Sequence, residues 1–170
     1  MLEGVDGETL RHVALVAAAF GFGVGSGVLP VILNAEVYVV GMGALMPHPL
    51  LVFAILSLSA GTVLGKAIVF ELVRRGSTKV KRSVDRRPPR NRLTRLIRRG
   101  GDRMLALISH RYLGAATVLT SSLTGVPPLA AVTVLAGASR QPLWLFLLMV
   151  GIGRTAQFLA LAYLVHQIRF

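Results

Sequence analysis

Residues 30–43 read PVILNAEVYVVGMG, and this stretch decides the fold. A proline opens an apolar run that carries Asn34 and Glu36 near its middle. Proline has no backbone N–H to donate and its ring clashes with the preceding turn, so we expect a helix to break at Pro30. The stretch therefore predicts two helical pieces, with two polar side chains placed just after the break.

The sequence on either side of this stretch is apolar. Hydrophobic residues make up 54% of the 170 residues, the chain has no cysteine, and the mean hydropathy is +0.66. The apolar residues come in long blocks with few charges, over residues 12–33, 50–65, 113–138 and 142–165. A helix of about 20 such residues crosses a bilayer core of about 30 Å. We therefore predict an all-α integral membrane protein.

A basic segment separates two of these blocks. Residues 74–103 hold 13 of the 19 lysines and arginines against two aspartates, a net charge of +11. Positive charge beside membrane spans marks the cytoplasmic side, and it attracts anionic headgroups by about 1 kcal/mol per residue. No aromatic residues are interleaved for base stacking, which argues against a nucleic-acid partner. We expect a cytoplasmic loop whose partners are membrane lipids.

The two halves of the chain resemble each other. Each has an apolar run, a proline break at Pro30 or at Pro127 and Pro128, a short helix with Gly41 or Gly137, and a long apolar segment. Interrupted segments at matching places in two halves are typical of a transport site. We predict one membrane domain built as an inverted repeat of two re-entrant hairpins plus full spans. Its parts are a polar N-terminus (1–11), hairpin 1 (12–46), a transmembrane helix (50–73), the basic loop (74–103), a helix with hairpin 2 (104–140) and a last transmembrane helix (142–168). In the alternative, every short run crosses the bilayer fully.

Glu36 and Arg154 are the most conspicuous charges within the apolar runs. A charged side chain at the bilayer centre costs about 2.5–3.5 kcal/mol even on insertion scales, and it usually faces a protein interior or a watery cavity. We predict that Glu36 binds a proton or a headgroup beside the break, with Asn34 next to it. The alternative is that Glu36 lies at the membrane surface and caps the second half-helix. Arg154 lies too deep to reach the surface, so we expect it to pair with Glu36.

Other polar residues have weaker signals. Ser121, Ser122 and Thr124 precede the second break, where they either satisfy freed backbone groups or line a polar cavity opposite Glu36. Lys66 and Glu71 are too far apart for a helical pair, and we expect both to anchor the cytoplasmic boundary, with Lys66 extending its ammonium outward. Gly61 and Gly65 form a small-residue face that permits a homodimer.

Several motifs point to no chemistry. GFGVGSG at residues 21–27 does not match a dinucleotide-binding fingerprint or a P-loop. The four histidines lack metal-ligand spacing, and no nucleophile and base can be paired. We therefore predict no metal, no cofactor and no enzymatic activity.

Four stretches taken together resemble the DedA family, also called the VTT or SNARE-associated Golgi protein family, and above all its short bacterial YqaA-like members. They are PVILNAEVYVVGMGAL, AGTVLGKAIVFELVRRG, HRYLGAATVLTSSLTGVPPLAAVTVLAGAS and FLLMVGIGRTAQFLALAYL, which lie between residues 30 and 164. The matching positions are Pro30, Glu36, Gly41, Gly65, Arg74, Gly76, Gly114, Pro127 and Gly137.

The resemblance implies two re-entrant hairpins that face each other and a transport role in the bacterial plasma membrane. Relatives are linked to moving lipids between leaflets, including a polyprenyl-phosphate carrier. The chain departs from the family where Lys66 replaces an acid and where Thr124 and Ala130 replace arginines. Arg140 and Arg154 are the arginines that would take their place as phosphate contacts.

We therefore predict a membrane transport protein that translocates or scrambles lipids, whose headgroups follow a polar groove between the hairpins. Two alternatives stay open. One is a proton-coupled transporter of small solutes that uses the same site. The other is a non-transporting membrane adaptor that acts through the basic loop.

Overall fold

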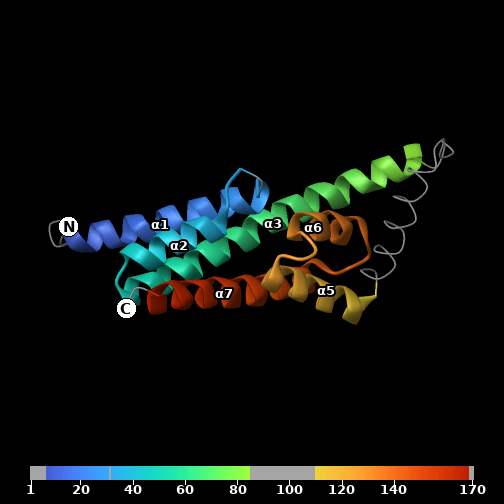
Figure 1. The fold of residues 1–170 in the computed structure, drawn as a ribbon. Helices are drawn as coiled ribbons and strands as arrows, with labels where there is room; N and C mark the ends of the chain where they lie inside the picture. The colour runs from blue at the N-terminus through green and yellow to red at the C-terminus, as the bar shows by residue number, and fades with distance from the viewer. Residues whose placement is uncertain (1–6, 31, 85–109, 169–170) are drawn as a thin grey trace. The chain divides into compact units, whose positions relative to one another are not determined.

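The computed structural model describes residues 7–30, 32–84 and 110–168, and within these ranges it contains helices and no strand. The described residues form six helices (Figure 1): α1 (Gly7–Val28), α2 (Ala35–Leu45), α3 (His48–Val84), α5 (Arg111–Thr124), α6 (Leu129–Ala138) and α7 (Leu143–Ile168). They form two compact units, which are described separately below. Unit 1 comprises Met1–Lys66 and Arg154–Phe170, and unit 2 comprises Ala67–Gly153.

Within the described ranges, three helical segments are long and apolar enough to cross a membrane: Gly7–Val28, Pro49–Ser77 and Leu143–Val165. The first of these was expected to be one arm of a re-entrant hairpin. Its 22 residues extend over about 33 Å at 1.5 Å per residue, so it is a further candidate span. By contrast, α2 has 11 residues and α6 has 10, about half the length that a span needs. The all-helical membrane class is confirmed, whereas re-entry of the hairpins stays a prediction.

Helix α3 is longer than its sequence predicted. It runs from His48 to Val84, so residues 74–84, which were expected to begin the basic loop, are helical. No proline occurs between Pro49 and Pro88, and charged residues such as lysine and arginine are good helix formers. The helix therefore continues past the point where the apolar residues give way to basic ones. The rest of the predicted loop and the predicted helical start at residue 104 lie outside the described residues.

In unit 1, α1 packs against the first half of α3 through glycines on both helices. A Cβ added at Gly27 would lie 2.7 Å from the backbone oxygen of Thr62, and one added at Gly65 would lie 2.5 Å from that of Val24. Side chains larger than hydrogen do not fit at such distances, which is why small residues permit close helix approach. The face of Gly61 and Gly65, which was expected to permit a homodimer, is thus covered by α1 of the same chain.

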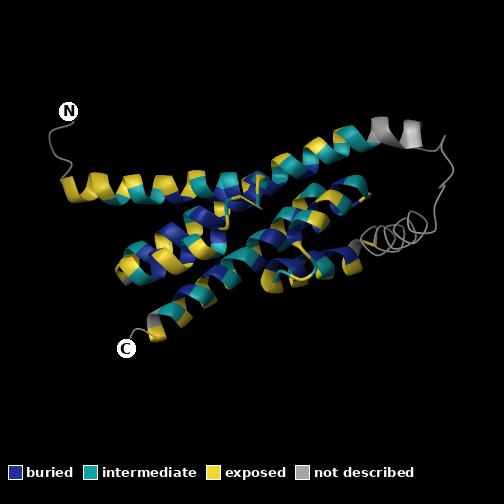
Figure 2. Cartoon of the chain, turned by 45° about the horizontal axis from the view of Figure 1, so that its top comes forward, coloured by how far each residue is buried: buried dark blue, intermediate teal, exposed yellow. Residues whose placement is uncertain are grey.

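The core of unit 1 lies between α2, α3 and the second half of α7. Val39, Leu58 and Phe158 come one from each of these helices and are fully buried. Helix α1 joins this core through Phe22, whose ring stacks on Tyr38 with the centroids 4.3 Å apart. The outward faces of the helices are exposed (Figure 2) and carry large apolar side chains such as Phe53. Apolar outer faces of this kind suit contact with lipid.

Unit 2 combines α5, α6, the first half of α7 and the second half of α3. Phe70 of α3 stacks on Phe146 of α7 with centroids 4.8 Å apart. A Cβ added at Gly137 of α6 would lie 2.7 Å from the backbone oxygen of Phe70, so Gly137 is a close-packing position. Arg74 lies over the Phe70 ring and donates to the backbone carbonyl of Gln141. Each unit thus has a pair of helices joined at a break and packed against parts of both long helices.

Candidate functional site

The break between α1 and α2 is completed by Asn34. Helix α1 ends at Val28, Pro30 follows in the connection, and α2 begins at Ala35. The Asn34 side-chain oxygen accepts from the backbone N–H of Glu36 at 2.9 Å and of Val37 at 3.5 Å. This is the position that asparagine favours at the start of a helix. The alternative in which Glu36 caps α2 is therefore wrong, because Asn34 is the cap.

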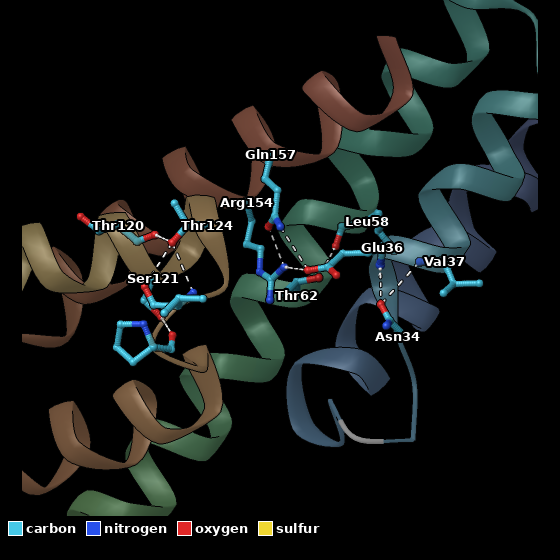
Figure 3. A network of polar contacts seen from close by, with 12 residues as sticks. Asn34, Glu36, Val37, Leu58, Thr62, Thr120, Ser121, Thr124, Arg154 and Gln157 are labelled. Atoms are coloured by element: carbon cyan, nitrogen blue, oxygen red, sulfur yellow. Dashed lines mark hydrogen bonds and ion pairs between the residues drawn. The ribbon is translucent and has the colours of Figure 1, made fainter. Parts of the chain in front are cut away.

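The carboxylate of Glu36 instead meets two side chains of α7 (Figure 3). Its Oε1 accepts from Arg154 Nη1 at 3.2 Å and from Gln157 Nε2 at 3.1 Å. The same Arg154 Nη1 donates to Gln157 Oε1 at 2.8 Å. The ion pair predicted between Glu36 and Arg154 is present, and Gln157 closes the contact into a triangle.

Gln157 was missed in the sequence, although a signal existed. It follows Arg154 by three residues on one helix, and residues at this spacing lie on the same face. An amide that both accepts from the guanidinium and donates to the carboxylate holds the two charged groups in a fixed geometry.

The ion pair is unevenly exposed. The Arg154 side chain is 13% exposed, whereas that of Glu36 is 43% exposed. The Arg154 guanidinium also lies 5.5 Å from the centre of the Phe158 ring, within reach of a cation–π contact. The arginine is therefore held within the protein, and the carboxylate is the accessible member of the pair.

A pocket of about 170 Å³ opens at this ion pair. Its lining consists of Ser26, Pro30, Leu33, Asn34, Ala35, Glu36, Thr62 and Arg154. The hydroxyls of Ser26 and Thr62 each donate to a carbonyl of their own helix at 2.9 Å, so they offer only oxygen lone pairs to the pocket. Arg154 is thus the charged donor of the lining, and Glu36 is its charged acceptor.

The hydroxyls before the second break belong to unit 2 and bond to backbone groups. Ser121 donates to the carbonyl of Pro127 at 2.5 Å, and Ser122 lies 2.9 Å from the carbonyl oxygen of Leu119. Thr124 donates to the carbonyl of Thr120 at 2.8 Å and accepts from the backbone N–H of Val126 at 3.2 Å. These contacts fit the expectation that they satisfy the broken backbone. Their place in a cavity opposite Glu36 stays a prediction.

Two further basic residues have different surroundings from those expected. Arg140 is exposed in the turn after α6, and it does not line the pocket at Glu36. Lys66, which was expected to extend its ammonium to the membrane boundary, is 2% exposed and ranks among the most buried large side chains. Glu71 pairs with Arg75 at 3.7 Å on the surface of α3, so Lys66 and Glu71 are not partners. The boundary role predicted for Lys66 is wrong.

Comparison with known proteins identifies a family whose model covers most of the chain. The profile of the VTT domain matches residues 12–167. No curated protein matches the chain significantly. No solved structure matches it significantly either. The matched range includes both helix breaks and all the residues of the pocket.

Proposed function

Because the chain belongs to the VTT domain family, whose members are membrane proteins linked to transport, we propose that it translocates lipids between the two leaflets of the bacterial plasma membrane. The basic segment that starts at Arg74 then faces the cytoplasm, as the positive-inside rule requires. The observation that carries this proposal is the polar pocket at the α1–α2 break, which places an ion pair next to helices with apolar outer faces.

The pocket suits a headgroup better than a whole molecule. Its volume of about 170 Å³ is below the range of about 300–1,000 Å³ that encloses drug-sized ligands. A lipid would therefore place only its polar group there, while its acyl chains stay along the apolar faces of the helices. Such an arrangement lowers the cost of moving a polar group through hydrocarbon, which is the main barrier to spontaneous flip.

Glu36 and Arg154 have distinct roles in this proposal. Arg154 is the more buried of the two and is fixed by Gln157 and Phe158. It supplies a permanent cation that a headgroup phosphate can contact. Glu36 is the accessible partner, and it holds the guanidinium in the empty site. Entry of a headgroup exchanges one acceptor of Arg154 for another, so the charge is never left without a partner inside the membrane.

Lipid flip in proteoliposomes tests the proposal. We expect the wild-type chain to accelerate flip of a fluorescent phospholipid, and we expect Glu36→Gln and Arg154→Gln to reduce the rate at least about tenfold, which corresponds to about 1.4 kcal/mol. Glu71→Gln and Arg75→Gln are matched controls, since they remove the same two kinds of charge from the surface ion pair of α3. Both controls should retain the wild-type rate.

Other outcomes would favour the two alternatives. No flip above empty vesicles, for zwitterionic phospholipid, anionic phospholipid and polyprenyl phosphate alike, would contradict lipid translocation and favour transport of a small solute. If activity in cells survives Glu36→Gln but is lost when the arginines of residues 74–103 become glutamine, the adaptor function is favoured.

A further inference from the structure

Gln141, in the turn between α6 and α7 of unit 2, has a buried amide that the proposed function does not use. Its side chain is 1% exposed and is among the largest that are fully buried. Neither the side-chain nitrogen nor the side-chain oxygen has a hydrogen-bond partner among the described residues. A buried amide without partners keeps the whole cost of leaving water. The observed position of Gln141 is therefore unfavourable for its side chain, and other contacts of the turn must offset that cost.

The backbone of the same turn, by contrast, is well bonded. The carbonyl of Gln141 accepts a hydrogen bond from Arg74 of α3, and the backbone N–H of Gln141 donates to the Ser139 side-chain oxygen at 3.1 Å. The Ser139 hydroxyl donates to the carbonyl of Ala136, in the last turn of α6, at 2.8 Å. These contacts hold the turn through its main chain, and the amide of Gln141 takes no part in them.

Arg74 is the contact that fastens the turn to a neighbouring helix. Its guanidinium lies 4.5 Å from the centre of the Phe70 ring, and this ring is stacked on Phe146 of α7. A charge-assisted hydrogen bond is stronger than a neutral one, and a cation–π contact adds to it. Arg74 thus stabilises the observed position of the turn, and the unpaired amide of Gln141 destabilises it by an amount of the same order.

The turn lies between two elements that are held independently of it. Gly137 packs so closely against the backbone of Phe70 that a Cβ added there would lie 2.7 Å from the Phe70 oxygen, which fixes the end of α6. Helix α7 begins at Leu143. Arg140, inside the turn, is exposed, so the turn lies at the surface of unit 2. A small displacement of residues 139–142 is therefore enough to bring the amide of Gln141 to water.

We propose that the turn at residues 139–142 is a conformational switch, in which Arg74 stabilises a closed state and the unpaired amide of Gln141 favours an open one. The closed state is the one observed, with the carbonyl of Gln141 bonded to Arg74. In the open state that bond is broken and the amide forms hydrogen bonds with water. Because the two contributions oppose each other, opening is a local event that leaves the other helices folded. The inference concerns this turn alone and does not rest on lipid translocation, so either can fail without the other.

Hydrogen exchange of the full chain in an uncharged detergent tests the switch, with mass spectrometry of peptides that cover residues 139–141. We expect Gln141→Leu, which replaces the amide by an apolar side chain of similar size, to raise the melting temperature and to slow this exchange at least about tenfold. Arg74→Gln removes the charge that holds the turn, and it should speed the exchange by a similar factor. Gln167→Leu and Arg75→Gln are the matched controls on exposed surfaces, and both should leave exchange at the turn unchanged.

The sign of the Gln141→Leu effect separates a switch from a purely structural amide. If the amide instead stabilises the closed turn through a trapped water, Gln141→Leu loses that contact. The variant would then melt at a lower temperature and exchange faster at the turn, and the switch would be overturned. Exchange that slows equally in α2 and at the turn would also overturn it, because the substitution would then act on global stability rather than on a local opening.

A single thiol keeps the test decisive if Gln141→Leu folds poorly. The chain contains no cysteine, so Gln141→Cys carries one thiol, at a position that is buried in the closed state. A water-soluble maleimide reaches this thiol only when the turn opens. We expect the addition of Arg74→Gln to speed labelling at least about fivefold, and the addition of Arg75→Gln to leave the rate unchanged. Equal labelling rates with and without Arg74→Gln would show that Arg74 does not hold the turn closed, which overturns the switch.

Discussion

Each of the two helix breaks leaves backbone groups without their helical hydrogen bonds. Different side chains bond to these groups at the two breaks. At the α5–α6 break, Ser121 reaches the carbonyl of Pro127, a contact between residues six positions apart. At the α1–α2 break, Asn34 caps α2 in an equally local way, but Glu36 also bonds Arg154, which is 118 positions away. Hydroxyl and amide groups are enough to satisfy a broken helix in a membrane. The charged groups at the first break are thus more than the fold needs.

The two breaks also differ in how completely their polar groups are used. Ser121 and Thr124 donate to backbone carbonyls, so their donors are engaged. At the first break Arg154 keeps a buried donor without a partner among the described residues. Native proteins rarely tolerate such groups unless a ligand, ion or water completes them. This contrast is the reason for assigning function to the first break and structure to the second.

Placing a carboxylate at the second break should give the largest effect. Ala130 is the second residue of α6, as Glu36 is of α2. We expect Ala130→Glu to destabilise the folded chain by about 2.5–3.5 kcal/mol, the insertion cost of a charge at membrane depth. The readout is the yield of folded protein and its melting temperature in detergent.

Ala130→Gln is the matched control, since it adds the same length of side chain without the charge. It should cost much less than Ala130→Glu. Wild-type yield and melting temperature for Ala130→Glu would contradict the comparison, because that result would place the second break at the membrane surface.

Much of this arrangement was predictable from the sequence, because its signals are local. Pro30, Pro127 and Pro128 interrupt apolar runs, and a proline in a helix interior breaks it wherever the helix lies. Glu36 and Arg154 are charges within apolar runs, which nearly always find partners. Their pairing was predicted because an inverted repeat would bring hairpin 1 near the last span.

The burial of Lys66 and the packing of the α3 glycines depend on which helix packs over which part of α3. A single sequence does not show that packing. Lys66 was expected at a boundary because α3 becomes basic a few residues later, but it lies on the part of the helix that the protein covers. The same covering explains why the glycines of α3 pack against α1 rather than a second copy. The length of α3 was underestimated because the change from apolar to basic residues marks a change of solvent, not the end of a helix.

Removing a hydroxyl at the second break should lower stability without affecting transport. Ser121 is fully buried, and Ser121→Ala leaves the carbonyl of Pro127 without its donor. The expected loss is about 1–3 kcal/mol of folding free energy, measured by thermal unfolding. Thr120→Ala is the control, because its exposed hydroxyl bonds within one helix and should cost under about 0.5 kcal/mol.

The flip rate per folded molecule should be the same for Ser121→Ala and the wild type. A rate that falls as far as it does for Glu36→Gln would show that Ser121 takes part in transport, and the division between a functional and a structural break would fail.

The smallest effect is expected from the cap that the first break has and the second lacks. Helix α6 begins at Leu129, and its N-cap residue Pro128 makes no side-chain cap bond, whereas Asn34 caps α2 with its side-chain oxygen. Asn34→Ala should cost about 1 kcal/mol, and Asn34→Ser should restore most of it, because serine caps nearly as well as asparagine. Since Asn34 orients the first turn that carries Glu36, we expect flip to fall only two- to threefold, by roughly 0.5 kcal/mol. If Asn34→Ala instead abolishes flip at unchanged melting temperature, and Asn34→Ser does not restore it, the amide contacts the transported headgroup directly and Asn34 belongs with Glu36 and Arg154.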